Sequence, residues 1–206
     1  FWWGNGGNDK RSATLVKIET DEGINGWGEG WGGVGLFKDM FNKAVMGKNP
    51  LEREKIWSDM FDELNNPIIY PGIGGSAMSA IDIALWDITG KKLGVPVSVL
   101  LGGKVKEKVH VYATGLYYTR KNFNDEVDER IKEAKKYEKN GFNAMKIKIG
   151  ALKVDKDLER VSKVKSSLNS NTMLSVDANQ AYDLRTAKYV SDKLHEMDIF
   201  FFEEPI

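Results

Sequence analysis

The second half of the chain alternates between short apolar segments and longer amphipathic segments. The apolar segments are typical of buried strands, and the amphipathic ones place their apolar residues at helical spacing. Strands separated by helices form parallel sheets with right-handed crossovers. We expect strands at residues 109–114, 144–149, 172–177 and 199–203, with helices at 125–140, 153–168 and 183–196.

Two architectures contain such units, an open doubly wound sheet and a (β/α) barrel. The strand ends carry Lys, Asp and Glu, and no strand is followed by Gly-x-Gly-x-x-Gly or another phosphate-binding turn. A barrel places its chemistry at the C-terminal ends of its strands. The pattern therefore favours the first half of a modified (β/α) TIM-type barrel, truncated after about four strands, over an open nucleotide-binding sheet.

The first half of the chain has mixed α and β character. Residues 13–20 and the following INGWGEG segment read as two strands joined by a Gly-containing turn. Apolar residues return at helical spacing over 51–64 and 76–93. We expect an α+β domain over 1–103, incomplete at its start, and the partial barrel over 104–206.

Composition excludes several classes of protein. The 30 basic residues balance 30 acidic ones, so nucleic acid is an unfavourable partner. The absence of cysteine excludes disulfides, thiolate metal sites and cysteine nucleophiles. No apolar run is long enough to span a membrane, and Phe1 to Asp9 does not resemble a signal peptide. We expect a cytoplasmic protein, and both ends of the chain look cut.

Two lysines stand on one predicted strand. Lys146 and Lys148 are two residues apart in MKIKIG, so they share a face of the strand. A buried ammonium is costly without a partner, and a desolvated lysine can act as a base. The alternative is an exposed edge strand with two solvated lysines.

Acidic residues end the next two predicted strands. Asp177 and Asn179 share a face in VDANQAY, and Glu203 and Glu204 end FFFEEP. Asp177 and Asn179 could instead cap the following helix. Carboxylates at adjacent strand ends repel unless a cation lies between them, and oxygen ligands suit Mg²⁺. Strand parity does not decide whether Glu203 or Glu204 faces inward, because phenylalanines fill both faces.

Four segments of the chain form a recognisable series. They are GINGWGEG, SAIDIALWDITGKKLGVPVSVLLGG, the Lys-x-Lys of MKIKIG, and VDANQAY followed by FFEEP. In this order and spacing they resemble the mandelate racemase and muconate lactonizing enzyme group of the enolase superfamily. The resemblance implies a capping domain before the barrel and an active site between them. It also implies Mg²⁺-dependent removal of a proton α to a carboxylate through an enediolate.

The resemblance also implies roles for individual residues. Lys148 matches the catalytic base, and Lys146 matches its partner near the substrate carboxylate. Asp177 and Glu203 match two magnesium ligands. Asn179 and Glu204 are expected beside these ligands or the substrate. The third carboxylate ligand of the family, and the later lysine or His/Asp pair that separates its subgroups, fall beyond residue 206.

The reaction that follows proton removal is open at this point. The segment YATGLYY looks like members that act on acid sugars, so we favour a sugar-acid dehydratase, with a racemase, epimerase or cycloisomerase as the alternative. A catalytically incomplete fragment or binding module is the rival from another class. We expect the 206 residues alone to be inactive and prone to associate, and the full-length form to be a homo-oligomer acting on a small carboxylic acid.

Several other conspicuous residues receive structural or loop assignments. His110 begins the first barrel strand and His195 lies in a helix, so neither is expected to be catalytic. Trp2 and Trp3 fall where the resemblance places a mobile specificity loop. A second substrate-covering loop is expected near Tyr70 to Gly75, which is rich in turn residues.

Overall fold

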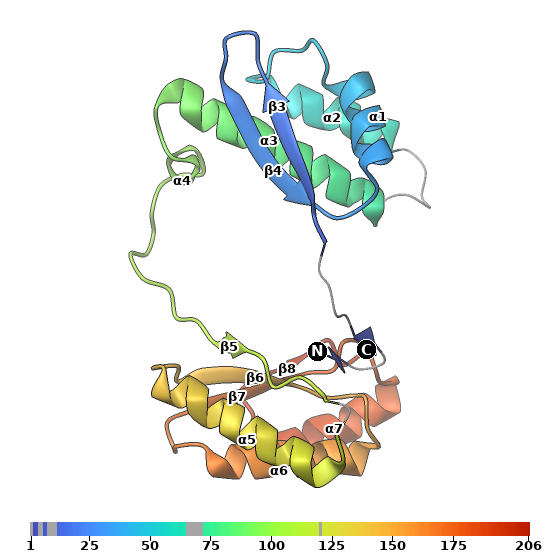
Figure 1. Cartoon of the computed structure of the whole chain (residues 1–206), viewed down its shortest axis with the longest axis vertical. Helices are drawn as coiled ribbons and strands as arrows, with labels where there is room; N and C mark the ends of the chain where they lie inside the picture. The colour runs from blue at the N-terminus through green and yellow to red at the C-terminus, as the bar shows by residue number, and fades with distance from the viewer. Residues whose placement is uncertain (1, 4–5, 8–11, 65–71, 120) are drawn as a thin grey trace. The chain divides into compact units, whose positions relative to one another are not determined.

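The computed structural model describes residues 2–3, 6–7, 12–64, 72–119 and 121–206. By internal contacts the chain divides into two compact units, one of residues 11–107 and one made chiefly of residues 108–206 (Figure 1). The boundary expected near Gly102 and Gly103 remains a prediction. None of the helices in these described segments has the length and apolar character needed to cross a membrane.

The first unit packs an antiparallel hairpin against a long central helix. Its elements are β3 (Thr14–Glu19), β4 (Asn25–Gly30), α1 (Val34–Ala44), α2 (Arg53–Glu63), α3 (Ile73–Leu93) and α4 (Val97–Leu100). The hairpin and the helices α2 and α3 match the elements expected here. Helix α1 was not expected, because three glycines precede or interrupt its first turn.

Small residues let the hairpin approach α3 closely. A Cβ atom on Gly28 would stand 1.9 Å from the carbonyl oxygen of Ala80, and one on Gly26 would stand 2.0 Å from that of Ala84. The alternating glycines of β4 therefore form the face that rests on the helix backbone. Behind this face, α3 contributes a buried apolar stripe that includes Ile81, Leu85 and Ile88.

The second unit is a four-stranded parallel sheet in the order β5-β6-β7-β8. Its elements are β5 (Ala113–Thr114), α5 (Phe123–Lys139), β6 (Ala144–Lys148), α6 (Val154–Ser167), β7 (Met173–Asp177), α7 (Leu184–Glu196) and β8 (Phe202–Glu203). Figure 1 shows the three helices on the same side of this sheet. A doubly wound sheet carries helices on both faces, so the arrangement confirms the partial barrel.

The strands at the two edges of this sheet are shorter than the sequence pattern suggested. Residues 109–112 precede β5 without strand pairing. Before β8, the backbone N–H of Phe200 donates to Leu174 O at 2.8 Å and Phe201 O accepts from the N–H of Val176 at 3.0 Å, so this segment bonds to β7 before the regular strand begins. Ladder bonds need a partner on the neighbouring strand, and an apolar pattern alone does not supply one. The central strands β6 and β7 have the predicted lengths to within one residue.

Two loop predictions concern segments near the ends of the described ranges. Trp2–Trp3 and Gly6–Gly7 form a short antiparallel ladder, β1 with β2. Residues 70 and 71 lie outside the described residues, and α3 begins at Ile73. The substrate-covering roles expected for both segments remain predictions.

Candidate active site

The register of the parallel sheet aligns the ends of its strands. Lys148, the last residue of β6, pairs with Asp177, the last residue of β7. Asp177 pairs in turn with Glu203, the last residue of β8. Because carboxyl ends of parallel strands meet at one edge, the strand register brings the lysine and the two carboxylates to the same level.

Both lysines of β6 are buried and contact the same carboxylate. Lys148 Nζ lies 2.6 Å from Asp177 Oδ2, and Lys146 Nζ lies 3.4 Å from the same oxygen. Lys146 Nζ also donates to Glu203 Oε2 at 2.6 Å. Strand β6 lies between β5 and β7, so the lysines are not the solvated side chains of an exposed edge strand. Paired carboxylates offset the cost of burying their ammonium groups.

Asn179 and Glu204 extend this cluster. Asn179 Oδ1 accepts a hydrogen bond from Lys148 Nζ at 2.7 Å, while its backbone N–H donates to Asp177 Oδ1 at 2.9 Å. Asn179 Nδ2 donates to Glu204 Oε2 at 3.3 Å. The cap of α7 is instead Asp183, which accepts from Thr186 N at 2.7 Å. Asp177 and Asn179 thus face the lysine rather than cap that helix.

Backbone conformation at the end of β8 lets both glutamates reach the cluster. Glu203 ends β8 and contacts Lys146, whereas Glu204 has a φ of 41°. A positive φ ends the alternation of side chains along a strand. Glu204 therefore turns back toward Asn179, and both glutamates contribute to the cluster.

Tyr112 is a further contact, which the sequence reasoning did not single out as a site residue. Lys146 Nζ lies 3.4 Å from Tyr112 Oη and 5.2 Å from the centre of its ring. The residue precedes β5, where the chain has no strand pairing. Its position within YATGLYY was the available signal, but the pattern did not reveal which tyrosine meets the lysine.

The charges of the cluster fix its protonation. Burial opposes ionisation of Asp177, but hydrogen bonds from Lys148 and from the backbone of Asn179 outweigh it, so the pKa of Asp177 lies below its ordinary value. Burial also opposes the charged form of Lys146, but its hydrogen bonds with Glu203 and Tyr112 and the nearby carboxylates raise its pKa to about 12. In this structure Lys146 is therefore held in its charged form by Asp177 and Glu203.

The donor set fits a hard cation. Asp177 and Glu203 offer carboxylate oxygens from adjacent strand ends, which suits Mg²⁺. In the part of the chain that the structure describes, no three His, Asp or Glu side chains gather as a complete metal site. If a metal ion binds here, these two residues would supply only part of its coordination sphere. His110 and His195 are exposed.

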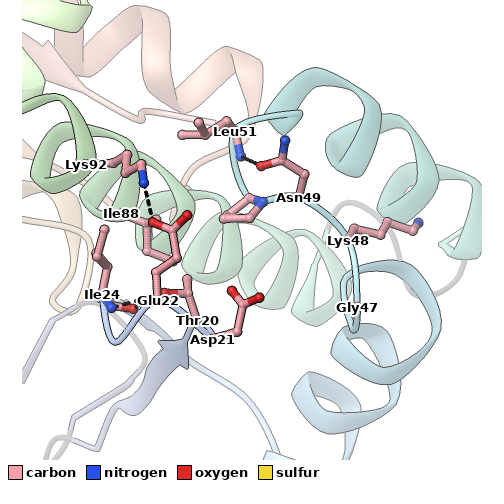
Figure 2. A pocket seen from close by; sticks show the side chains of 11 residues that line it. Thr20, Asp21, Glu22, Ile24, Gly47, Lys48, Asn49, Leu51, Ile88 and Lys92 are labelled. Atoms are coloured by element: carbon pink, nitrogen blue, oxygen red, sulfur yellow. Dashed lines mark hydrogen bonds and ion pairs between the residues drawn. The ribbon is translucent and has the colours of Figure 1, made fainter.

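The first unit contains a separate pocket of about 380 Å³ (Figure 2). It lies between the β3–β4 turn, the loop after α1 and the C-terminal end of α3. Its lysines are already paired: Lys92 contacts Glu22, and Lys48 lies 2.7 Å from Asp59. None of the sequence-predicted site residues lines it, and we assign it no catalytic role.

Two family models match the chain. The mandelate racemase / muconate lactonizing enzyme N-terminal domain matches residues 5–102, and the enolase C-terminal domain-like model matches residues 129–206. Together they account for both halves of the fold described above. The chain belongs to the mandelate racemase and muconate lactonizing enzyme family of the enolase superfamily.

Relatives with different reactions resemble the chain. It is 36% identical over 201 residues to D-galactarolactone cycloisomerase of Agrobacterium fabrum, covering 96% of this chain and 52% of that protein. It is 33% identical over 217 residues to arabinonate dehydratase of Saccharolobus solfataricus, covering 97% and 57%. The chain thus spans about half the length of the curated relatives it matches.

A solved structure also shares the fold. A racemase from Streptomyces coelicolor with bound magnesium superposes with a TM-score of 0.82 at 30% identity, covering 94% of this chain and 58% of that one. Magnesium binding is therefore found within the family. In this chain, Asp177 and Glu203 are the candidate ligands for such an ion.

The pKa of Asp177 leads to a pH-dependent stability. A carboxyl whose pKa is lowered by folding contributes stability above its unfolded pKa of about 3.9, and this contribution is lost as pH falls through the folded value. We expect Asp177→Asn to lower the free energy of unfolding by about 3 kcal/mol at neutral pH. The difference from wild type should shrink below about pH 4. Urea denaturation at both pH values measures it.

The control is Asp198→Asn. The Asp198 side chain is 99% exposed and its φ is 53°, a conformation that asparagine tolerates. This variant should follow the wild-type pH dependence. An Asp177→Asn variant as stable as wild type at neutral pH would contradict the importance of the buried pair.

Proposed function

We propose that this chain supplies the base and two metal ligands of a Mg²⁺-dependent enzyme that removes the proton α to the carboxylate of a small acid. The observation that carries the proposal is the cluster at the strand ends, in which two buried lysines surround Asp177 and reach Glu203 and Asn179. Apolar side chains would fill such a position at lower cost if the barrel interior were only a core.

Each side chain then has a distinct task. As the neutral amine, after its ammonium has lost a proton, Lys148 accepts the α proton, and the Lys146 ammonium, paired with Asp177 and Glu203, binds the substrate carboxylate. Asp177 and Glu203 would hold a Mg²⁺ ion, which when bound would stabilise negative charge on the substrate carboxylate. Asn179 orients Lys148 and Asp177 through its hydrogen bonds. Glu204 holds the Asn179 amide in turn.

We favour dehydration of an acid sugar as the complete reaction. Relatives named arabinonate dehydratase and D-galactonate dehydratase are 33% and 31% identical to the chain and support this choice. Cycloisomerisation and racemisation remain candidates, because D-galactarolactone cycloisomerase and N-succinyl-L-Arg/Lys racemase are comparably similar. Proton removal is the step expected to be common to all three.

The common step can be tested before the product is known. In the intact protein with Mg²⁺, a panel of aldonic and aldaric acids in deuterated water should reveal either deuterium at the α carbon or a 2-keto-3-deoxy product. Lys148→Met should lower this rate by about 10²- to 10⁴-fold, the usual contribution of a general base. The control Lys188→Met removes an exposed lysine of α7 and should leave the rate unchanged.

The outcomes separate the alternatives. A 2-keto-3-deoxy product identifies a dehydratase, and deuterium without net loss of water identifies an isomerase, that is a racemase, epimerase or cycloisomerase. Equal rates in Lys148→Met and wild type would reject Lys148 as the base.

The two glutamates provide a matched test of metal binding. Glu203→Gln should raise the Mg²⁺ concentration needed for half-maximal activity by about tenfold or more, since it removes a direct ligand charge. Glu204→Gln keeps a hydrogen-bond acceptor for Asn179 and should have a smaller effect. Titration of metal-stripped protein with Mg²⁺ measures both. A larger effect at Glu204 would reverse the assignment.

A further inference from the structure

Arg160 of α6 is fully buried on the side of β6 opposite the lysine side chains. Its Nη1 donates to the carbonyl oxygen of Lys148 at 2.5 Å, and its Nη2 donates to that of Leu116 at 2.9 Å. Its Nε lies 2.6 Å from Glu126 Oε1. The guanidinium stacks 4.3 Å from the ring centre of Tyr118. The contact with Glu126 is an ion pair without hydrogen-bond geometry, so the two carbonyl oxygens are the hydrogen-bond acceptors of this buried cation.

Burying a cation at a core position carries a large desolvation free energy. Its neighbours on α6, Val161 and Val164, are fully buried and apolar. Replacing a buried ion pair with apolar side chains of similar volume is often neutral or stabilising. Core packing alone therefore does not explain why an arginine occupies this position. Its hydrogen bonds to two backbone carbonyl groups offer a reason.

Those carbonyl groups belong to the ends of two strands. Strand β5 pairs with β6 only as far as Lys146, so Lys148 lies beyond that ladder. Leu116 follows β5 and is fully buried with a φ of 53°, a strained conformation for a branched residue. Arg160 donates hydrogen bonds to the carbonyl groups of both residues, at points where the β5–β6 ladder has ended.

Asp157, one turn earlier on α6, holds the segment that follows Lys148. Its Oδ2 accepts from the backbone N–H of Gly150 at 2.8 Å and of Leu152 at 3.3 Å. Its Oδ1 accepts from the hydroxyl of Tyr118, which stacks on Arg160. Arg160 and Asp157 of α6 thus form hydrogen bonds with the backbone of Lys148, Gly150 and Leu152.

We propose that Arg160 is a positioning residue for Lys148. By holding the Lys148 carbonyl it fixes the backbone at the end of β6, and this directs the amine toward Asp177 and Asn179 on the opposite side. The inference rests on the proposed function only for its effect on rate. The effect on the geometry of Lys148 stands independently of any reaction.

The test uses two substitutions of Arg160 in the intact protein. Arg160→Lys keeps the charge but loses the fork that reaches both carbonyl groups. The pair Glu126→Gln with Arg160→Met removes both charges of the ion pair, while the buried Asp157 keeps its hydrogen bonds with Tyr118 and with the backbone of Gly150 and Leu152. At a temperature where circular dichroism shows each variant folded, kcat for α-proton exchange should fall by about 100-fold, as expected for a base misplaced by about 1 Å. KM should stay within about twofold.

The matched control is Arg130→Lys. Arg130 lies on α5, donates to the carbonyl oxygen of Tyr117 and pairs with Glu133 at 3.2 Å. Like Arg160, Arg130 binds a backbone carbonyl of the segment after β5, but it has no hydrogen bond with Lys148. This variant should lose stability comparable to that of Arg160→Lys and keep the wild-type kcat.

A second readout does not depend on activity. The ammonium group of Lys148, held by Asp177 and Asn179, should give a side-chain ¹⁵N NMR signal that Lys148→Arg removes. The signal should shift or disappear in both Arg160 variants and persist in Arg130→Lys. If folded Arg160 variants keep both the Lys148 signal and kcat, the positioning role is overturned. If no acid supports exchange in wild type while the signal still responds to Arg160, the proposed function fails and the positioning role is upheld.

Discussion

The pairing of Lys148 with Asp177 across the β6–β7 ladder is the constraint on which the cluster depends. These residues are register partners at the ends of adjacent parallel strands, and their side chains meet at 2.6 Å. A slip of one residue would send every side chain of β6 to the other face. The lysines would then enter the apolar layer beneath the helices, and Met145 and Ile147 would face the cluster. The register is therefore specified jointly by the burial of apolar residues and by charge pairing.

Buried charge occurs on both sides of β6, with different consequences. On one side, Lys146 and Lys148 share the carboxylate of Asp177, and Glu203 adds a second negative charge beside Lys146. On the other, Arg160 binds backbone carbonyl groups and pairs with Glu126. The first cluster presents groups that can change partners when a ligand binds. The second is closed to solvent, because Arg160 is fully buried whereas the Glu203 side chain of the first cluster is 37% exposed.

Sequence periodicity was sufficient for the parts of the site that obey strand parity. The spacing of Lys146 and Lys148 predicted their common face, and the position of Asp177 at a strand end predicted its place near them. Parity did not resolve Glu203 from Glu204, because phenylalanines occupy both faces of that strand, and a positive φ at Glu204 then lets both glutamates join the cluster.

Other features depend on tertiary contacts that no local pattern records. Arg160 stands in an amphipathic helix among many charged residues, and nothing in its spacing distinguishes a buried arginine from a solvated one. Tyr112 meets Lys146 through the path of an unpaired segment before β5. The resemblance to a known family indicated the role of each site residue, and the structure shows which residues each of these side chains contacts.

The most direct test of the account is a crystal structure of the intact protein with Mg²⁺ and an unreactive analogue of an acid sugar. The account predicts an ion bound by the carboxylates of Asp177 and Glu203. It also predicts that Lys148 Nζ lies about 3 Å from the α carbon of the analogue, within reach for proton transfer. An ion held by other residues, or an analogue whose α carbon is out of reach of Lys148, would contradict it.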